Sequence, residues 1–358
     1  MTVASPAPPD LGLIAETIHA KIPFHAEFSR LVPLAGDASN RRYFRVILNG
    51  GSRSLILMQL ASPEAFKQSE EAISGAKTEI RELPFINVLN HLAKADVSVP
   101  VLYYYDHAAG LLYLEDFGDV TLAEACRKDP GQSRRLYHDA IDMLIRIHTQ
   151  ATVPANPKCI AFARAFDVPL LMWEFEHFLE YGVVARQGKP MCADDAVSIQ
   201  AEFKKIAELL AGQPRVLTHR DYHSRNLMVD HDRLGVIDFQ DALMGPAVYD
   251  VASLLRDAYM ALDESLIEEL IAAYVDGMAA AGSRFGSRDE FRRLFDLMSI
   301  QRNLKAAGRF VYIDRVKHNP KFLADIPRVL GYVKRNLAKY PELATLRRHL
   351  TPYVPELQ

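Results

Sequence analysis

"THRDYHSRNLMVDHDRLGVIDFQDA", residues 218–242, places charged and polar residues directly beside two short apolar runs, LMV and GVI. Short aliphatic runs of this kind are typical of buried strands. We expect the two runs to form an antiparallel hairpin whose turn is centred between Asp232 and Arg233, so that Asn226 lies opposite Phe239. The polar residues then gather at one end of the hairpin.

Three oxygen-bearing side chains converge in this arrangement. Asp221 lies in the loop before the first strand, Asn226 lies at the start of that strand, and Asp238 ends the second one. Mg²⁺ prefers carboxylate and carbonyl oxygens and leaves positions open for water and phosphate, so Asn226 and Asp238 are candidate metal ligands. Asp221 is then able to orient a hydroxyl and accept its proton. Phosphoryl transfer requires this set of roles.

Composition limits the class of protein. The chain has 358 residues, enough for two lobes that each bury a core, and its 49% apolar and 24% charged residues are those of an ordinary globular protein. A net charge of -3 and the lack of a long Lys/Arg run argue against nucleic-acid and membrane partners, so we expect a small-molecule partner. We also expect a monomer.

Targeting and cysteine patterns add two expectations. The N-terminal sequence has no charged start followed by an apolar stretch, and no run approaches the roughly 18 apolar residues that span a bilayer, so we expect a cytoplasmic protein. The cysteines Cys126, Cys159 and Cys192 show no CxxC pairing, which argues against a disulfide framework or a thiolate zinc site.

We expect a first lobe, residues 1–118, that is rich in strands. The segments RRYFRVIL and RSLILMQL contain β-branched, aromatic and aliphatic residues, and the glycine-bearing turn at residues 49–51 between them predicts a hairpin. Residues 83–95 carry apolar side chains at the spacing of one helix face. Two further strands flank residues 107–110.

From residue 119 to residue 358 the pattern predicts a second, mainly helical lobe. Residues 134–150 repeat apolar side chains every three or four positions, and residues 264–282 and most of 288–349 are also helical in pattern. The predicted fold is therefore α+β, with a small β-rich N-lobe, a hinge near residues 115–119 and a larger helical C-lobe. We expect the ligand in a cleft between the lobes.

Several segments resemble one superfamily. HRDYHSRN followed by IDFQDA resembles the HxDxxxxN catalytic loop and metal-binding aspartate of the aminoglycoside phosphotransferase and protein-kinase-like superfamily. LAGDASNRRYFRV, LLYLEDFGD and GPAVYDVASLL resemble its nucleotide loop, its hinge and the segment after the metal aspartate. More narrowly, LPFINVLNHL, THRDYHSRNLMV and QRNLKAAGRFVYI resemble the anomeric amino-sugar kinases of bacterial peptidoglycan recycling. That resemblance implies ATP- and Mg²⁺-dependent phosphorylation of the C1 hydroxyl of N-acetylmuramate and N-acetylglucosamine.

The resemblance also implies roles for single residues. It makes Asp221 the catalytic base and Asn226 and Asp238 the magnesium ligands. Asp250 resembles the buried aspartate that braces the catalytic loop, and His219 is assigned a structural role in the same loop. The backbone of three hinge residues would receive the adenine: Glu115, Asp116 and Phe117.

Two features depart from the kinase pattern. Kinases place a lysine on the third strand to hold the α- and β-phosphates, but here the corresponding position is Met58 or Gln59. The nucleotide loop has one glycine, Gly36, instead of three.

No G-x-x-x-x-G-K-[ST] motif exists, which excludes a P-loop enzyme. Guanidinium groups bind phosphate oxygens bidentately, so the arginines of the nucleotide loop are candidates to replace the lysine. The nucleotide-binding candidates in this loop are Ser39, Asn40, Arg41 and Arg42.

Six residues are candidates for acceptor binding: His223, Arg225, Asp241, Gln301, Arg302 and Lys305. The first three lie in or after the catalytic loop and face either substrate or solvent. The last three lie close together on a helix, where they meet either a sugar or lactyl carboxylate or only solvent.

Two alternative functions remain open. Another small-molecule kinase of the same fold, acting on an aminoglycoside, choline or homoserine, would share the catalytic residues. The basic segment QRNLKAAGR favours an anionic acceptor over a polycationic one. The second alternative is a non-catalytic kinase-like binding module, although such modules commonly lose the base or a metal ligand and all three are present here.

Overall fold

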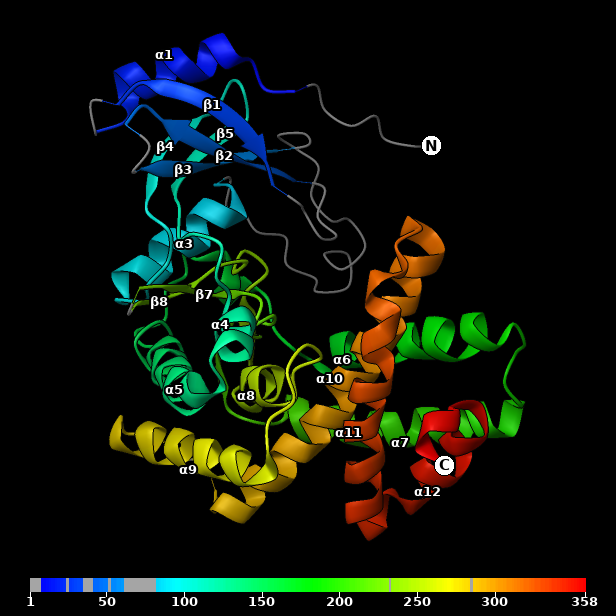
Figure 1. Cartoon of the computed structure of the whole chain (residues 1–358). Coiled ribbons are helices and arrows are strands. Elements are labelled where there is room, and N and C mark those ends of the chain that lie inside the picture. The colour runs from blue at the N-terminus through cyan, green and yellow to red at the C-terminus, as the bar shows by residue number, and fades with distance from the viewer. Residues whose placement is uncertain are drawn as a thin grey trace. The chain divides into compact units, whose positions relative to one another are not determined.

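The computed structural model describes residues 8–23, 26–34, 41–50, 53–60, 82–231, 233–283 and 286–358. By their contacts these residues group into two compact units (Figure 1). The first unit ends at Asp119, and the second contains the chain from Val120 to Gln358. Residues 82–98 also group with the second unit, whereas the sequence analysis placed them in the first lobe.

The first unit is an antiparallel sheet with a helix. The strand order is β1-β2-β3-β5-β4, and the pairs β2–β3 and β4–β5 confirm the two hairpins predicted from the sequence. Gly50 has φ +90 in the turn between β2 and β3, a conformation that glycine adopts without strain. The elements are α1 (Leu11–Lys21), β1 (Phe28–Pro33), β2 (Arg42–Leu48), β3 (Ser54–Gln59), β4 (Leu102–Asp106) and β5 (Leu111–Glu115).

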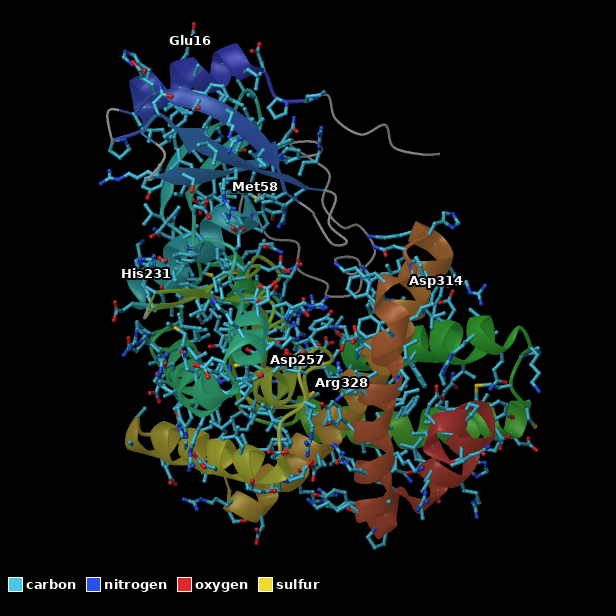
Figure 2. The ribbon with its side chains drawn as sticks, in the orientation of Figure 1. Glu16, Met58, His231, Asp257, Asp314 and Arg328 are labelled. Atoms are coloured by element: carbon cyan, nitrogen blue, oxygen red, sulfur yellow. The ribbon has the colours of Figure 1, made fainter. Side chains whose placement is uncertain are left out.

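The two faces of this sheet are different. Apolar residues such as Val46 point toward α1 and share a buried core with Ile18. Directly paired residues on antiparallel strands point to the same face, so Tyr43, Met58 and Leu112 lie together on the opposite face. Met58, labelled in Figure 2, is fully buried. Of the two positions where a kinase lysine was sought, Met58 therefore carries an apolar, buried side chain, and Gln59 lies on the sheet face toward α1.

The second unit is mainly helical, and together with the sheet it confirms the predicted α+β fold. Its strands form two short antiparallel ladders, β6 (Arg215–Thr218) with β9 (Leu243–Pro246) and β7 (Leu227–Asp230) with β8 (Arg233–Val236). Within the described ranges, none of the helices is long and apolar enough to cross a membrane. The helices are α3 (Pro84–Lys94), α4 (Leu122–Lys128), α5 (Ser133–Thr149), α6 (Val168–His177), α7 (Ala193–Ala211), α8 (Val248–Leu255), α9 (Glu264–Ala280), α10 (Arg288–Lys317), α11 (Ile326–Lys339) and α12 (Ala344–Leu350), with a π-helix, η3 (Phe178–Ala185), after α6.

The β7–β8 hairpin forms, but its predicted register was wrong. Leu227 pairs with Val236, and the carbonyl of Asn226 accepts a hydrogen bond from the N–H of Ile237 at 3.0 Å, so Asn226 does not lie opposite Phe239. The turn is centred one residue earlier than predicted. Each residue's partner therefore moves by two positions, which leaves every side chain on its predicted face because the strand repeat is two.

Helix α3 is held by side-chain and ring contacts within the second unit. The Nε2 atom of His91 donates to the carbonyl of Ala151 at 2.7 Å. The ring of Phe85 packs against that of Phe239, with centroids 5.0 Å apart. Phe239 directly follows Asp238, so α3 contacts the segment that carries a predicted metal ligand.

Helix α10 is long and lies inside the second unit, where it packs against α6, α8 and α11. Its N-terminus has a capping box between Ser287 and Glu290. At Gly308 the helix approaches η3 so closely that a Cβ atom would lie 2.7 Å from the Cα atom of Phe178. This packing fixes the stretch of α10 that carries three of the predicted acceptor-binding residues.

Candidate active site

The predicted catalytic loop connects β6 to β7 and contains unusual backbone geometry. Arg220, directly before Asp221, has φ +78, and Asp238 has φ +64. Residues other than glycine rarely adopt this left-handed conformation, which costs on the order of 1–3 kcal/mol and persists only where the surrounding structure fixes it. Both strained residues adjoin or belong to the predicted catalytic set.

Asp250 on α8 holds this strained backbone through two hydrogen bonds. Its carboxylate accepts hydrogen bonds from the backbone N–H groups of His219 at 2.6 Å and Arg220 at 2.9 Å. The Nε2 atom of His148 lies 3.2 Å from the same carboxylate, and its Nδ1 atom lies 2.6 Å from the hydroxyl of Tyr274. Because a carboxylate only accepts, His148 donates to Asp250 through Nε2, and its Nδ1 atom forms a hydrogen bond with the hydroxyl of Tyr274. The side chain of His148 is fully buried.

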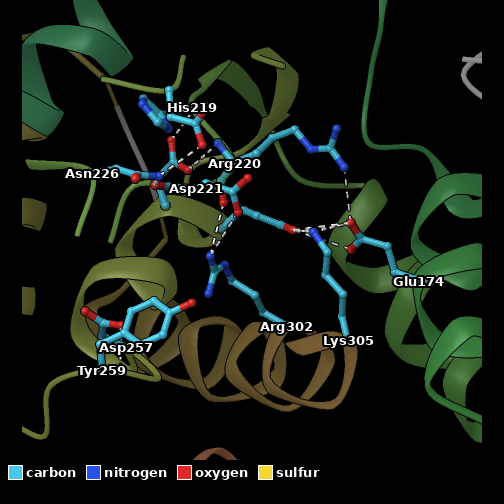
Figure 3. Close-up of polar contacts among 12 residues, drawn as sticks. Glu174, His219, Arg220, Asp221, Asn226, Asp257, Tyr259, Arg302 and Lys305 are labelled. Atoms are coloured by element: carbon cyan, nitrogen blue, oxygen red, sulfur yellow. Dashed lines mark hydrogen bonds and ion pairs between the residues drawn. The ribbon is translucent and has the colours of Figure 1, made fainter. Parts of the chain in front are cut away.

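Asn226 contacts both Asp221 and Asp238, and Figure 3 shows Asn226 beside Asp221. The Nδ2 atom of Asn226 donates to the backbone carbonyl of Asp221 at 2.9 Å and lies 3.5 Å from Oδ2 of Asp238. The side-chain amide of Gln240 holds the other Asp238 oxygen at 2.9 Å. His219 connects the catalytic loop to the segment that carries Asp238, because its Nε2 atom donates to the carbonyl of Ile237 at 3.0 Å. The structure therefore joins the Asn226 amide to the Asp238 carboxylate and to the backbone carbonyl of Asp221, the residue that carries the predicted base.

Two cations on α10 determine the charge environment of Asp221. Figure 3 shows Arg302 directed from the helix toward Asp221 and Lys305 directed toward Glu174. The Nη2 atom of Arg302 lies 3.6 Å from Oδ1 of Asp221. Burial raises the pKa of Asp221, but Lys305 and Arg302 outweigh it and hold that pKa well below its usual range. Asp221 is therefore a carboxylate anion at neutral pH.

Glu174 on α6 is a buried acid that the sequence analysis did not single out. It has no exposed surface, and its carboxylate lies 2.7 Å from Nζ of Lys305 and 3.4 Å from a guanidinium nitrogen of Arg220. Gln301 is also fully buried and donates to Glu174 at 2.8 Å. Two of the predicted acceptor-binding residues, Gln301 and Lys305, thus contact an internal acid. The signal in the sequence was their spacing of four residues, but nothing in it identified Glu174 as their partner.

Asp257 and Tyr259 contact residues 223–225 of the catalytic loop. The sequence analysis did not single them out. Asp257 is almost fully buried and accepts hydrogen bonds from the backbone N–H and the hydroxyl of Ser224. The guanidinium carbon of Arg225 lies 3.6 Å from the centre of the Tyr259 ring, a close cation–π contact. The ring of His223 packs edge-on against the same tyrosine at 5.2 Å. His223 and Arg225 are thus held against one aromatic ring, and Asp241 lies beyond Asp238, 3.4 Å from the amide of Gln240.

The predicted nucleotide-binding residues lie in the first unit, except that Ser39 and Asn40 fall outside the described residues. Arg42 lies over the ring of Phe44 at 5.0 Å, on the sheet face that α1 covers. The Asp116 carboxylate accepts from Arg45 at 2.6 Å and from Ser54 at 2.6 Å. The other candidates in this unit lie at the ends of strands: Arg41 before β2, and Glu115 and Phe117 at and after the end of β5.

The side chains at the hairpin end fit a magnesium ion. Asp238 offers a carboxylate oxygen, and Asn226 offers Oδ1 because its amide nitrogen is directed at Asp221. In the described part of the chain no three His, Cys, Asp or Glu side chains are grouped as a metal site. Magnesium sites that handle phosphates commonly use one or two carboxylates and leave the other positions to water and phosphate oxygens. One carboxylate and one amide oxygen are consistent with such a site.

Comparison with known proteins identifies the family. Residues 30–283 match the model of the phosphotransferase enzyme family. The chain belongs to this family. This phosphotransferase is 34% identical over 323 residues to the N-acetylmuramate/N-acetylglucosamine kinase of Pseudomonas aeruginosa, a match that covers 89% of this chain and 87% of the relative.

Solved structures show the same fold. Choline kinase LicA from Streptococcus pneumoniae has a TM-score of 0.59 at 17% identity, covering 92% of this chain and 99% of that chain. The streptomycin–ATP–APH(2'')-IIa ternary complex has a TM-score of 0.57 at 12% identity, covering 94% and 99%. The family match over residues 30–283 and the 34% identical relative confirm the predicted relationship to the aminoglycoside phosphotransferase and kinase-like superfamily, and these structures agree with it in fold.

Proposed function

We propose that this phosphotransferase is an ATP-dependent kinase that phosphorylates the anomeric C1 hydroxyl of N-acetylmuramate and N-acetylglucosamine. The relative in Pseudomonas aeruginosa, which matches over most of both chains, carries this name. The observation that carries the proposal is the meeting of Asp221, Asn226 and Asp238 at one end of the β7–β8 hairpin. We propose the cytoplasm as the location of this reaction and the monomer as the active form of the enzyme.

Asp221 acts as the general base in this proposal. The C1 oxygen attacks the γ-phosphorus of ATP, the bond from that phosphorus to the bridging oxygen breaks, and ADP leaves with the bonding electron pair. The proton of the hydroxyl passes to the Asp221 carboxylate. A hemiacetal hydroxyl is more acidic than an ordinary alcohol, which eases proton transfer to a carboxylate whose pKa lies below its usual range. The cations around Asp221 keep it in the anionic form that this step requires.

Asn226 and Asp238 would hold Mg²⁺, which when bound offsets charge on the phosphate oxygens. Their geometry is fixed by protein contacts: Gln240 holds one oxygen of Asp238, and the Asp221 carbonyl holds the amide of Asn226. Both side chains are thus oriented by protein contacts. This preorganisation is what positioning-dependent catalysis requires.

The experiment is an incubation of the full-length protein with ATP, Mg²⁺ and each sugar, followed by ³¹P NMR of the product. We expect a phosphate on C1 and an equal amount of ADP. The matched control is the 1-O-methyl glycoside of N-acetylglucosamine, which lacks the free C1 hydroxyl and should not react. Phosphorylation of the methyl glycoside, or turnover only with choline, homoserine or an aminoglycoside, would contradict the proposal and assign another hydroxyl as acceptor.

A further inference from the structure

Arg220 is held at three points by three helices. Its backbone N–H donates to Asp250 on α8, and its guanidinium pairs with Glu174 on α6. Its backbone carbonyl accepts a hydrogen bond of 3.2 Å from the Nη2 atom of Arg302 on α10. Arg220 has φ +78 and directly precedes Asp221, so these contacts determine where the next residue points.

We propose that Arg302 is a positioning residue for the catalytic base. This inference rests on the proposed role of Asp221. One nitrogen of Arg302 bridges the carbonyl of Arg220 and Oδ1 of Asp221, at 3.2 Å and 3.6 Å. The bridge connects the strained backbone to the carboxylate that follows it. A change at Arg302 therefore alters both the peptide that aims Asp221 and the rotation of its side chain.

The surroundings of Arg302 keep its guanidinium in place. The residue is 7% exposed, and its guanidinium carbon lies 5.6 Å from the centre of the Tyr249 ring. The hydroxyl of Tyr249 accepts a hydrogen bond from Lys305 at 2.9 Å. A planar guanidinium in a packed site loses little freedom when it makes its hydrogen bonds, so it holds its partners in a defined orientation.

The two oxygens of Asp221 are not equivalent as a result. Oδ1 faces Arg302, and the side chain as a whole remains 43% exposed. Arg302 thus holds one oxygen and leaves Oδ2 to accept the hydroxyl proton of the acceptor. The distance of 3.6 Å is that of an ion pair and is longer than a normal hydrogen bond, so Arg302 orients the carboxylate without occupying a proton-accepting position.

A comparison of two acceptor sugars distinguishes a positioning role of Arg302 from a role in substrate binding. N-acetylmuramate carries a lactyl carboxylate, whereas N-acetylglucosamine has no carboxylate. If Arg302 positions Asp221, Arg302→Gln lowers kcat roughly 10–100-fold on both sugars, because an error of about 1 Å in a reacting group costs about that much. KM for each sugar then changes less than about threefold. A rise in KM confined to N-acetylmuramate would overturn the proposal, since it would show that Arg302 binds the acceptor carboxylate.

Two further variants give the comparison its controls. Arg302→Lys keeps a cation that can donate to the Arg220 carbonyl, so it should recover part of the lost kcat. Arg309→Gln removes an arginine two turns further along α10, whose guanidinium lies over the Tyr312 ring at 4.8 Å, and should leave kcat unchanged. An Arg302→Gln enzyme with wild-type kcat, or a loss that Arg302→Lys does not relieve at all, would refute the positioning role.

Hydrogen exchange tests the same contact without any acceptor. We expect the backbone amides of residues 218–226 to exchange faster in Arg302→Gln than in the wild type, by a larger factor than the amides of the β2–β3 hairpin in the first unit. If the wild-type protein phosphorylates neither sugar, the proposed function fails, and this measurement still decides the role of Arg302. Unchanged exchange across the loop would overturn the inference by itself.

Discussion

The carboxylate of Glu174 lies 2.7 Å from the Nζ atom of Lys305, and the glutamate has no exposed surface. Removing one partner of a buried ion pair leaves an uncompensated charge, which typically costs 3–5 kcal/mol. Arg220 remains 3.4 Å from Glu174 and compensates part of that charge, so we expect Lys305→Met to lower the free energy of unfolding by about 3 kcal/mol, the lower end of that range. Chemical denaturation of the full-length protein measures this.

A second Lys–Glu pair provides the control for Lys305→Met. Lys204 lies 3.8 Å from Glu208 on the surface of α7, and both side chains are more than half exposed. Exposed pairs contribute at most about 1 kcal/mol, so Lys204→Met should change stability little. In the double variant, Glu174→Gln should restore part of the stability lost with Lys305→Met. Equal, small effects of the two lysine variants would show that the buried pair does not stabilise the fold.

The base assignment predicts a selective loss of turnover. Asp221→Asn keeps the size of the side chain but cannot accept a proton, so kcat should fall roughly 10²–10⁴-fold while KM for ATP stays nearly unchanged. Asp230→Asn, on a partly exposed aspartate at the end of β7, is the matched control and should turn over normally. Steady-state kinetics with both sugars measure the effect, and a wild-type kcat in Asp221→Asn would remove Asp221 from the mechanism.

The proposed metal ligands predict a changed magnesium dependence. Asp238→Asn removes the carboxylate of the pair, so the Mg²⁺ concentration for half-maximal rate should rise by tenfold or more, because carboxylate oxygens are preferred magnesium ligands. A titration of rate against Mg²⁺ at saturating ATP measures the shift. Gln240, which contacts Asp238 through its side chain, gives a milder test, because Gln240→Ala leaves both proposed ligands in place. A normal Mg²⁺ requirement in Asp238→Asn would contradict the ligand role.

Local patterns in the sequence were sufficient to predict much of the fold. The β2–β3 hairpin, helix α3 and the gathering of Asp221, Asn226 and Asp238 all depend on residues close together in the chain. The turn of the β7–β8 hairpin was misplaced by one residue because it has no glycine or asparagine to fix its position. The side-chain faces were still predicted correctly, because the strand repeat depends only on residue parity.

The residues that surround the site could not be predicted in the same way. Glu174 precedes the catalytic loop by more than 40 residues, and Asp257 follows it by more than 30, so their contacts exist only once the helices have packed. In the sequence each is one acid among 45. A buried acid is recognisable only from its partners, and the partner of Glu174 lies on α10, more than 120 residues away.

The Arg45–Asp116 pair predicts how stability depends on pH. Asp116 is 4% exposed and accepts from Arg45 at 2.6 Å, from Ser54 at 2.6 Å and from the N–H of Gly118 at 2.9 Å. Burial raises the pKa of Asp116, but these donors, with Arg45 the strongest, outweigh it and hold that pKa below its usual range. The carboxylate therefore stabilises the folded state above the ordinary aspartate pKa of about 3.9, and this contribution is lost as pH falls through the lower folded pKa.

Asp116→Asn should consequently be less stable than the wild type at pH 7, and the difference should shrink as the pH falls below about 4. Thermal melts of both proteins followed by circular dichroism between pH 7 and pH 3 measure it. Asp119→Asn is the matched control, because Asp119 pairs with the same Arg45 at 2.7 Å but is 75% exposed. An exposed pair contributes at most about 1 kcal/mol, so that variant should cost little at any pH. A difference between Asp116→Asn and the wild type that stays constant from pH 7 to pH 3 would show that hydrogen-bond geometry, and not the carboxylate charge, gives Asp116 its role.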